Sequence, residues 1–288
     1  MGNFDAPGVA ESIEALAEHL PTLGARVRVR AAANIQDPSD AVSIVAADLL
    51  TDTADLVIAV GGDGSMLTAA RVAAAANIPL IGINRGRLGF LADVSPSDKL
   101  ESLEKILAGE YNSEMRLLLR ADIITTDGPK DCGLALNDIV IKRHKVGRML
   151  DFRTTVDGRY VNTHGGDGFI VATPTGSTAY ALSCGGPIVT PNLDALVLTP
   201  ICPHTLSDRS IVIPATSVTE IELAEGVDRA EVSCDGEVTG YLEPGQKLRV
   251  ETAAHRVELI HPSGYDYYEI LRSKLSWGRG NRKSQVSD

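Results

Sequence analysis

The chain has few of the features that mark secreted, membrane or zinc-binding proteins. Its 288 residues include only four cysteines, and no two of them form a CxxC pair. Scattered cysteines are typical of reduced thiols in the cytoplasm and argue against a zinc site. There is no signal peptide, and no apolar run approaches the ~20 residues that span a membrane. We therefore expect a soluble, cytoplasmic protein.

Positive charge is also scarce, because 27 lysines and arginines stand against 38 aspartates and glutamates. The formal net charge of -11 argues against nucleic acid or an anionic membrane as the main partner. An anionic ligand would then be held by local features such as backbone N–H groups, a metal ion or a few basic residues. The length suits one large domain or two moderate ones.

Helical and strand patterns alternate up to about Asn112. The strands expected at residues 55–60 and 80–83 are continuously apolar, which favours a parallel, doubly wound sheet with helices on both faces. The other elements expected here are helices at 11–20, 40–50 and 65–76, a helix from Pro96 to Gly109 with Ser95 as its N-cap, and a strand at Val27–Arg30.

Strand patterns follow one another from residue 114 onward, which predicts a largely antiparallel β domain. Strands are expected at 117–125, 135–142, 151–156, 169–173, 195–199, 210–213, 218–223, 230–234, 247–251 and 256–260. Asp157-Gly158 is a hairpin signal, and helical spacing returns at Tyr267–Leu275. We divide the chain into an α/β domain (1–112), a β-rich domain (113–262) and a C-terminal segment (263–288).

A Gly-Gly-Asp-Gly motif at residues 61–64 directly follows the apolar strand 55–60. Its glycines let a backbone approach a ligand, and the start of the next helix favours phosphate. The carboxylate of Asp63 would repel phosphate unless it binds a metal or accepts a proton from a nucleophile. The motif lacks the Gly-Lys-Ser/Thr of a P-loop, and Leu67 replaces the third glycine of the dinucleotide fingerprint. An ordinary turn that closes a strand explains the motif equally well.

A second polar stretch, Thr-Pro-Thr-Gly-Ser-Thr-Ala-Tyr, occupies residues 173–180. Hydroxyl-rich glycine loops suit phosphate and ribose oxygens because they donate hydrogen bonds without adding charge; a polar β-to-α turn is the alternative. Asn137-Asp138 interrupts an apolar strand. An amide beside a carboxylate can bind a ribose diol, although a strand-edge pair also explains these two residues.

In order and spacing, these motifs resemble those of the NAD kinase family. The resemblance covers residues 61–64, Asn137-Asp138 and 167–180, is strengthened at 83–91, 203–206 and 233–235, and extends from about residue 7 to 277. It implies an α/β domain followed by a β-sandwich-like domain, with a C-terminal segment that packs back on the first. It also implies transfer of the γ-phosphoryl of ATP, or of polyphosphate, to the 2′-hydroxyl of the adenosine ribose of NAD, which makes NADP.

The resemblance further implies roles for single residues. Asp63 would accept the 2′-hydroxyl proton, Gly62 and Gly64 would contact phosphate, and Asn137 and Asp138 would hold the ribose region of NAD. The other substrate-binding positions it implies are Phe90 (against the adenine), Arg148, Asp167, Thr175, Thr178, Ala179, Tyr180, Ala181, Leu182, Ser183 and Glu237.

The sequence shows no dedicated metal cage. We therefore expect Mg²⁺, or another divalent cation, to arrive bound to ATP. The family also implies a homodimer or homotetramer. The sequence does not decide whether NADPH inhibits the protein by feedback.

Two features depart from the family pattern. Some relatives carry arginine where this chain has Gly165, which leaves the choice between NAD and NADH open. Relatives usually open with a strand before a glycine turn, whereas this sequence starts Met-Gly-Asn-Phe, so we expect that strand to be missing.

Two other functions remain as alternatives. A lipid kinase of the diacylglycerol or sphingosine type shares the Gly-Gly-Asp-Gly turn, but the polar loop at 173–180 argues against a channel for acyl chains. A non-catalytic dinucleotide-binding regulator would keep the glycines without needing Asp63.

Overall fold

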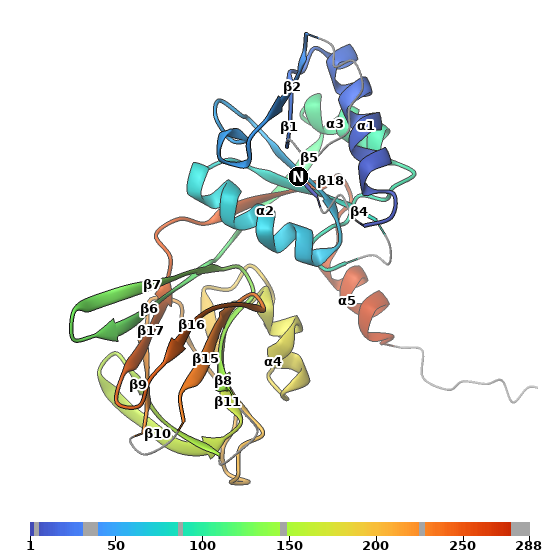
Figure 1. The fold of residues 1–288 in the computed structure, drawn as a ribbon. Helices are drawn as coiled ribbons and strands as arrows, with labels where there is room; N and C mark the ends of the chain where they lie inside the picture. Colours follow the sequence, from blue (N-terminus) through green and yellow to red (C-terminus); the bar gives the residue numbers. More distant parts are fainter. Residues whose placement is uncertain (3–5, 31–39, 86–88, 145–148, 225–227, 278–288) are drawn as a thin grey trace, which may run out of the picture. The chain divides into compact units, whose positions relative to one another are not determined.

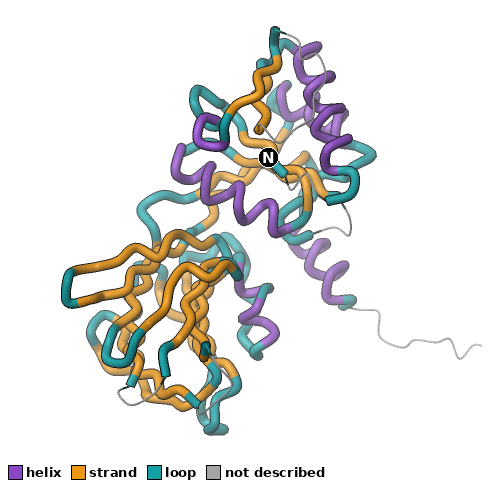
Figure 2. Tube along the Cα trace, in the orientation of Figure 1, coloured by secondary structure: helices purple, strands orange, loops and turns teal. Residues whose placement is uncertain are grey.

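The computed structural model describes residues 1–2, 6–30, 40–85, 89–144, 149–224 and 228–277. The chain folds into two compact units, Met1–Glu114 with Leu259–Asp288, and Met115–Glu258 (Figures 1 and 2). The return to the first unit thus begins at Leu259, whereas the sequence suggested a β-rich domain up to residue 262. The earlier return has a simple cause: the last strand, β18 (Val257–Pro262), pairs with β4 (Leu80–Asn84) of the first unit.

The first unit contains a four-stranded sheet in the order β3-β4-β18-β5, with β3 at Val57–Gly61 and β5 at Tyr111–Arg116. Strands β3, β4 and β18 are parallel. Helices α1 (Val9–His19) and α3 (Lys99–Leu107) share an apolar cluster with Ile81 and Ile83 of β4. Gly82 faces the other way, because a Cβ there would lie 2.5 Å from Sδ of Met66 in α2 (Asp63–Ala76). Helices therefore cover both faces, as the doubly wound prediction requires.

The prediction of a helix at residues 40–50 is wrong. The structure has strand β2 (Val42–Val45) in parallel register with β1 (Val27–Arg30), followed by a 3₁₀ turn at Ala47–Leu49. Pairing with β1 is a tertiary contact, and such contacts override weak local helical preference. The predicted cap at Ser95 is also wrong, since α3 begins at Lys99.

Two further details complete this unit. Gly2 forms a parallel bridge with Val60, beside β3, at the place where the sequence suggested that a strand is missing. The 3₁₀ turn η1 (Leu20–Leu23) extends α1, and the last helix, α5, spans Tyr267–Leu275 as predicted.

The second unit is a sandwich of two six-stranded antiparallel sheets. One sheet has the order β10 (Arg159–Gly166), β9 (Leu150–Val156), β14 (Thr219–Leu223), β17 (Lys247–Thr252), β6 (Leu119–Thr125) and β7 (Gly128–Ala135). The other has the order β13 (Ile211–Pro214), β12 (Ala195–Ile201), β11 (Gly168–Ala172), β8 (Asp138–Arg143), β15 (Ala230–Cys234) and β16 (Glu237–Leu242). One core cluster includes residues of both sheets, for example Phe152 of β9 and Phe169 of β11. The predicted β-sandwich-like architecture is confirmed.

The strands that the sequence did not reveal share one property. These strands, β2, β5, β7, β10 and β16, each lie at the edge of a sheet. An edge strand contributes few side chains to the core, so its apolar alternation is weak; β10, for instance, exposes most of its first five residues. The predicted hairpin at Asp157-Gly158, which connects β9 to β10, is confirmed, with φ of 51° and 74° at these two residues.

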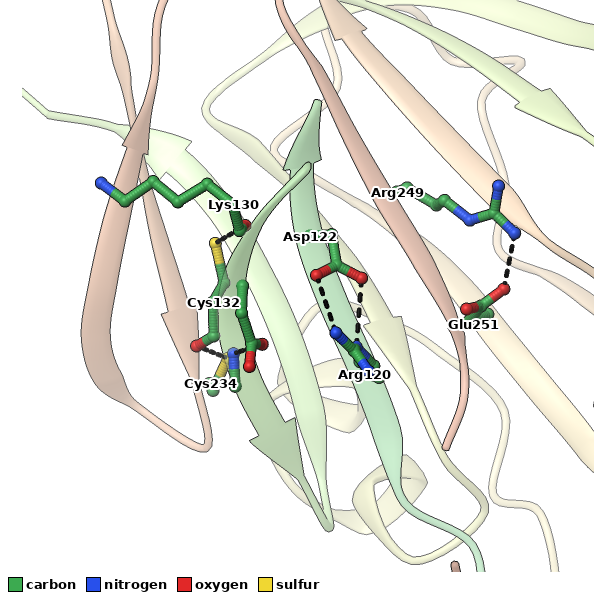
Figure 3. Close-up of polar contacts among 9 residues, drawn as sticks. Arg120, Asp122, Lys130, Cys132, Cys234, Arg249 and Glu251 are labelled. Carbon is green, nitrogen blue, oxygen red and sulfur yellow. Dashed lines mark hydrogen bonds and ion pairs between the residues drawn. The ribbon is translucent and has the colours of Figure 1, made fainter. Parts of the chain in front are cut away.

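Figure 3 shows polar contacts on β6, β7, β15 and β17. The ion pairs Arg120–Asp122 (3.2 Å) and Arg249–Glu251 (2.8 Å) involve exposed arginines, so each contributes little to stability. All four cysteines are free thiols. Burial raises the pKa of the Cys132 thiol, which disfavours the reactive thiolate. Within the described residues, no helix is both long and apolar enough to cross a membrane.

Candidate active site

Asp63 is the first residue of α2 and follows β3 after Gly61 and Gly62. Its Oδ2 accepts a hydrogen bond from the backbone N–H of Phe90 (3.0 Å), and its Oδ1 accepts one from Leu91 (3.1 Å). Bonds from N–H groups to an ionised carboxylate are stronger than neutral ones, so they hold this side chain in one orientation. The half-buried carboxylate therefore has a defined direction while part of it remains accessible.

The glycines around Asp63 fall into two groups. Gly61 and Gly89 are required by packing, since a Cβ would lie 2.2 Å from Oγ of Ser65 at Gly61 and 1.9 Å from Oδ1 of Asp63 at Gly89. Gly62 and Gly64 are different: they are exposed, and a Cβ at either would have no described heavy atom within 4 Å. Neither has a positive φ. Packing among the described residues thus gives no reason for glycine at these two positions, whereas close approach of a ligand would.

Phe90 contributes to this site through its backbone. The sequence suggested that its ring contacts adenine; the structure adds that its N–H binds Asp63. No local pattern in the sequence could reveal this bond, because donor and acceptor are 27 positions apart.

In the second unit, Asn137 and Asp138 lie at the start of β8, next to the end of β11 and the turn between β15 and β16. Asp235, from that turn, accepts hydrogen bonds from the backbone N–H groups of Leu136 (2.9 Å), Asn137 (2.7 Å) and Asp138 (3.2 Å). Asp235 had no predicted role. The Asp-Gly pair at 235–236, with φ of 50° and 82°, was the available signal for a tight hairpin there.

Asp138 is 5% exposed, and its carboxyl group lies in an unfavourable environment for a charge. Burial, and to a lesser extent the negative charge of Asp235, raise the pKa of Asp138 to about 7, although a hydrogen bond from the backbone of Tyr180 opposes the shift. Near neutral pH this group can therefore carry a proton, and its protonated form can donate as well as accept a hydrogen bond.

The hydroxyl-rich loop uses most of its hydroxyls internally. Thr173 donates to the carbonyl of Leu136 (2.5 Å), and Ser177 donates to the carbonyl of Pro174 (2.6 Å). Thr175 accepts a bond from the guanidinium of Arg116 (3.3 Å), and both side chains are buried. These hydroxyls thus fix the shape of the loop. Arg116, a buried cation that contacts this loop through Thr175, had no predicted role.

The remaining predicted positions differ in their surroundings. Thr178 ends the 3₁₀ turn η3 (Gly176–Thr178) and donates to the carbonyl of Thr175 (3.2 Å). Tyr180 and Ser183, at the two ends of helix α4 (Tyr180–Ser183), are exposed. Between Thr178 and Ser183, Ala179 and Leu182 are half-buried and Ala181 is buried. Glu237 is exposed at the start of β16, and Arg148 lies outside the described residues.

Asp167 lies at the opposite end of β11 from the Asn137–Asp138 pair. Its carboxylate pairs with Arg143 at 3.3 Å. The backbone N–H of Tyr180 donates to Asp138, and burial is the main cause that raises the pKa of the Tyr180 hydroxyl. A Cβ at Gly165, two positions earlier, would lie 3.0 Å from Oδ1 of Asp151. A longer side chain at Gly165 would therefore meet an acidic neighbour.

The described residues contain no group of three or more His, Cys, Asp or Glu side chains arranged to hold a metal ion. In the first unit, both oxygens of Asp63 already accept backbone hydrogen bonds.

An oriented carboxylate between open glycines at a helix start is typical of an enzyme that transfers a phosphoryl group to a hydroxyl. Two family models match this chain: the ATP-NAD kinase N-terminal domain at residues 13–111 and the ATP-NAD kinase C-terminal domain at residues 136–262. The chain belongs to the NAD kinase family.

Individual relatives support the same assignment. The NAD kinase of Nitrosococcus oceani is 44% identical over 280 residues, which are 97% of this chain and 96% of that protein. The NAD kinase of Aeromonas salmonicida is 43% identical over 279 residues, 94% of this chain and 93% of the relative.

Two solved structures are also similar. An Archaeoglobus fulgidus NAD kinase in complex with ATP is 27% identical, with a TM-score of 0.70 over 92% of this chain and 94% of that one. The yeast NADH kinase complexed with NADH is 22% identical and has a TM-score of 0.90 over 99% of this chain and 88% of that one, which shows likeness of fold.

Proposed function

We propose that the chain makes NADP by transferring the γ-phosphoryl of ATP to the 2′-hydroxyl of the adenosine ribose of NAD, with Asp63 as the general base. The O2′–Pγ bond forms as the bond from Pγ to the β–γ bridging oxygen breaks. ADP leaves, and the hydroxyl proton passes to a carboxylate oxygen of Asp63. The NAD kinase relatives, similar along nearly the whole chain, support this reaction.

The observation that carries the proposal is the pair of N–H donors on Asp63. Phe90 and Leu91 fix the carboxylate, which a base needs because proton transfer depends first on geometry. The open space at Gly62 and Gly64 lets phosphate oxygens approach the first N–H groups of α2.

The β-rich unit would hold NAD. In this proposal Asn137 and Asp138 hold ribose hydroxyls, and the exposed Tyr180 and Ser183, with Thr178, line the bound dinucleotide. Asp138 suits a hydroxyl ligand, because a donated hydrogen bond would stabilise a carboxylate that is otherwise buried beside Asp235. Phe90, Arg148, Asp167, Thr175, Ala179, Ala181, Leu182 and Glu237 stay in the proposal as further binding positions.

Mg²⁺ belongs to the proposal as a companion of ATP that neutralises phosphate charge. Assembly into a homodimer or homotetramer and a cytoplasmic location are also proposals. Light scattering coupled to size-exclusion chromatography would measure the oligomeric state.

The test is the variant Asp63→Asn in an NADP-formation assay, together with calorimetric titration of NAD. Asparagine keeps the shape but cannot accept the proton, so kcat should fall by about 10²–10⁴-fold while NAD binding is retained. Asp98→Asn is the matched control, because Asp98 is an aspartate at the start of another helix, as the N-cap of α3, and makes no side-chain cap bond. Wild-type turnover in Asp63→Asn would contradict the proposal and favour a non-catalytic regulator.

The same assay can distinguish acceptors and donors. NADH and diacylglycerol would replace NAD in parallel reactions, and polyphosphate would replace ATP. Phosphorylation of diacylglycerol but not of NAD would overturn the assignment of NAD as the acceptor.

A further inference from the structure

His261 and Asp93 form a buried pair close to the segment that binds Asp63. Nδ1 of His261 lies 2.8 Å from Oδ2 of Asp93, and the two side chains are only 1% and 9% exposed. With its proton on Nδ1, the imidazole donates to this carboxylate. The ring of Tyr265 stacks on His261, with centroids 3.8 Å apart, and Oε2 of Glu114 lies 3.8 Å from its Nε2. The bond to Asp93 and the stacked ring of Tyr265 thus hold the imidazole in one orientation.

Asp93 lies between two fixed points of the chain. On one side, Leu91 donates its N–H to Asp63. On the other, Val94 is bound to β4, accepting from the N–H of Asn84 (2.8 Å) and donating to the carbonyl of Gly82 (3.2 Å). The bond from Asp93 to His261 adds a connection to β18, the strand next to β4 in the sheet.

We propose that the His261–Asp93 pair is a positioning device for the general base. It fixes the backbone of residues 90 and 91, and through their N–H groups it orients the carboxylate of Asp63. The role rests on the proposed function of Asp63 as the base. Neither His261 nor Asp93 touches a reacting atom in this proposal, so both are positioning residues rather than catalytic residues.

The first test compares His261→Ala with His261→Asn. Alanine removes the donor, whereas the amide nitrogen of asparagine can occupy the Nδ1 position and keep the bond to Asp93. We expect alanine to lower kcat about 10-fold with little change in KM for NAD or ATP, and asparagine to restore most of the rate, because a small misplacement of a catalytic group is costly. His19→Ala is the matched control, because His19 of α1 also pairs with a carboxylate, that of Glu104 in α3, at 2.9 Å. This pair lies in the same unit but on other elements than His261 and Asp93.

The second test is a double-mutant cycle with Asp63→Asn. If the pair acts through Asp63, His261→Ala should cause no further loss of residual activity once Asp63 has been replaced. An equal further loss in the Asp63→Asn background would overturn the proposal, and so would a lower melting temperature with unchanged kcat. Wild-type activity of Asp63→Asn alone would instead refute the proposed base, which keeps the two failures distinct.

If His261→Ala fails to fold, Asp93→Asn replaces it in both tests. This variant keeps the side-chain volume and removes only the carboxylate, so we expect a few-fold loss in kcat and a native melting profile. An unchanged kcat in folded Asp93→Asn would overturn the proposal.

Discussion

The two units present carboxylates in opposite environments. In the α/β unit, Asp63 is half-buried and receives two backbone N–H groups. In the β-rich unit, Asp138 is almost fully buried, with a second carboxylate, Asp235, near enough to raise its pKa. The first environment orients a charge, whereas the second penalises one.

The difference indicates two separate tasks. An oriented, hydrogen-bonded carboxylate suits a base that must point at one proton. A buried carboxylate whose charge is disfavoured gains most when a ligand donates a hydroxyl hydrogen bond to it. Part of its cost to stability can then be recovered as binding specificity. Variants that change one environment at a time can test this comparison.

The largest effect is expected from Asp235→Ala. It removes the acceptor of three backbone N–H groups and leaves alanine at a φ of 50°, so we expect a loss of about 3–5 kcal/mol in the free energy of unfolding. Denaturant titration would measure it. Asp157→Ala is the matched control, because Asp157 has a φ of 51° in another Asp-Gly hairpin. Among the described contacts, its side chain accepts a hydrogen bond from the backbone N–H of Val218 (2.8 Å), so we expect a smaller loss. Equal losses would mean that turn strain, not support of residues 136–138, is the main role of Asp235.

The sequence predicted the parts of these environments that are local. An apolar strand, glycines and a following helix placed Asp63 at the start of α2, and the Asn-Asp pair stood out within an apolar strand. What it could not predict were bonds between distant segments, such as Asp63 with Phe90 and Asp235 with Leu136. These depend on which strand ends are neighbours, and edge strands such as β16 leave little periodic signal.

Asp138→Asn should stabilise the unliganded protein above neutral pH. In the folded state the pKa of Asp138 is raised from 3.8 to about 7, so the folded state binds a proton that the unfolded state releases. The contribution of Asp138 to the free energy of unfolding is therefore fully present below pH 3.8 and is lost as the pH rises through about 7. A shift of this size corresponds to at most about 4 kcal/mol. Asparagine removes this penalty, and we expect a higher melting temperature at pH 8 with at least about 10-fold weaker NAD binding.

Calorimetric titration of NAD and thermal melts from pH 4 to 8 would check both effects. If the melting temperatures of wild type and Asp138→Asn keep a constant difference across this range, Asp138 does not titrate there. Tighter NAD binding by the variant would contradict its assignment as a ribose ligand.

Gly89→Ala tests the other carboxylate. The new methyl group would lie 1.9 Å from Oδ1 of Asp63, so the side chain must turn away from the N–H groups of Phe90 and Leu91. We expect kcat to fall about 100-fold with KM for NAD little changed. Gly109→Ala is a control without a steric conflict, because no described heavy atom lies within 4 Å of its Cβ, although its φ of 91° adds strain. A loss in Gly89→Ala no larger than in this control would argue against an oriented Asp63.

Asp235→Asn should give the smallest effect, and it separates the two causes that raise the pKa of Asp138. Asparagine tolerates the φ of 50° and still offers an oxygen to the N–H groups, so the change is mainly the loss of one negative charge. Burial is the larger cause of the shift, so the pKa of Asp138 should fall only in part and stay above 3.8. Carbon-13 NMR titration of the aspartate carboxyl groups would measure it. A return to an ordinary pKa would mean that repulsion between the two carboxylates, rather than desolvation, distinguishes this environment from that of Asp63.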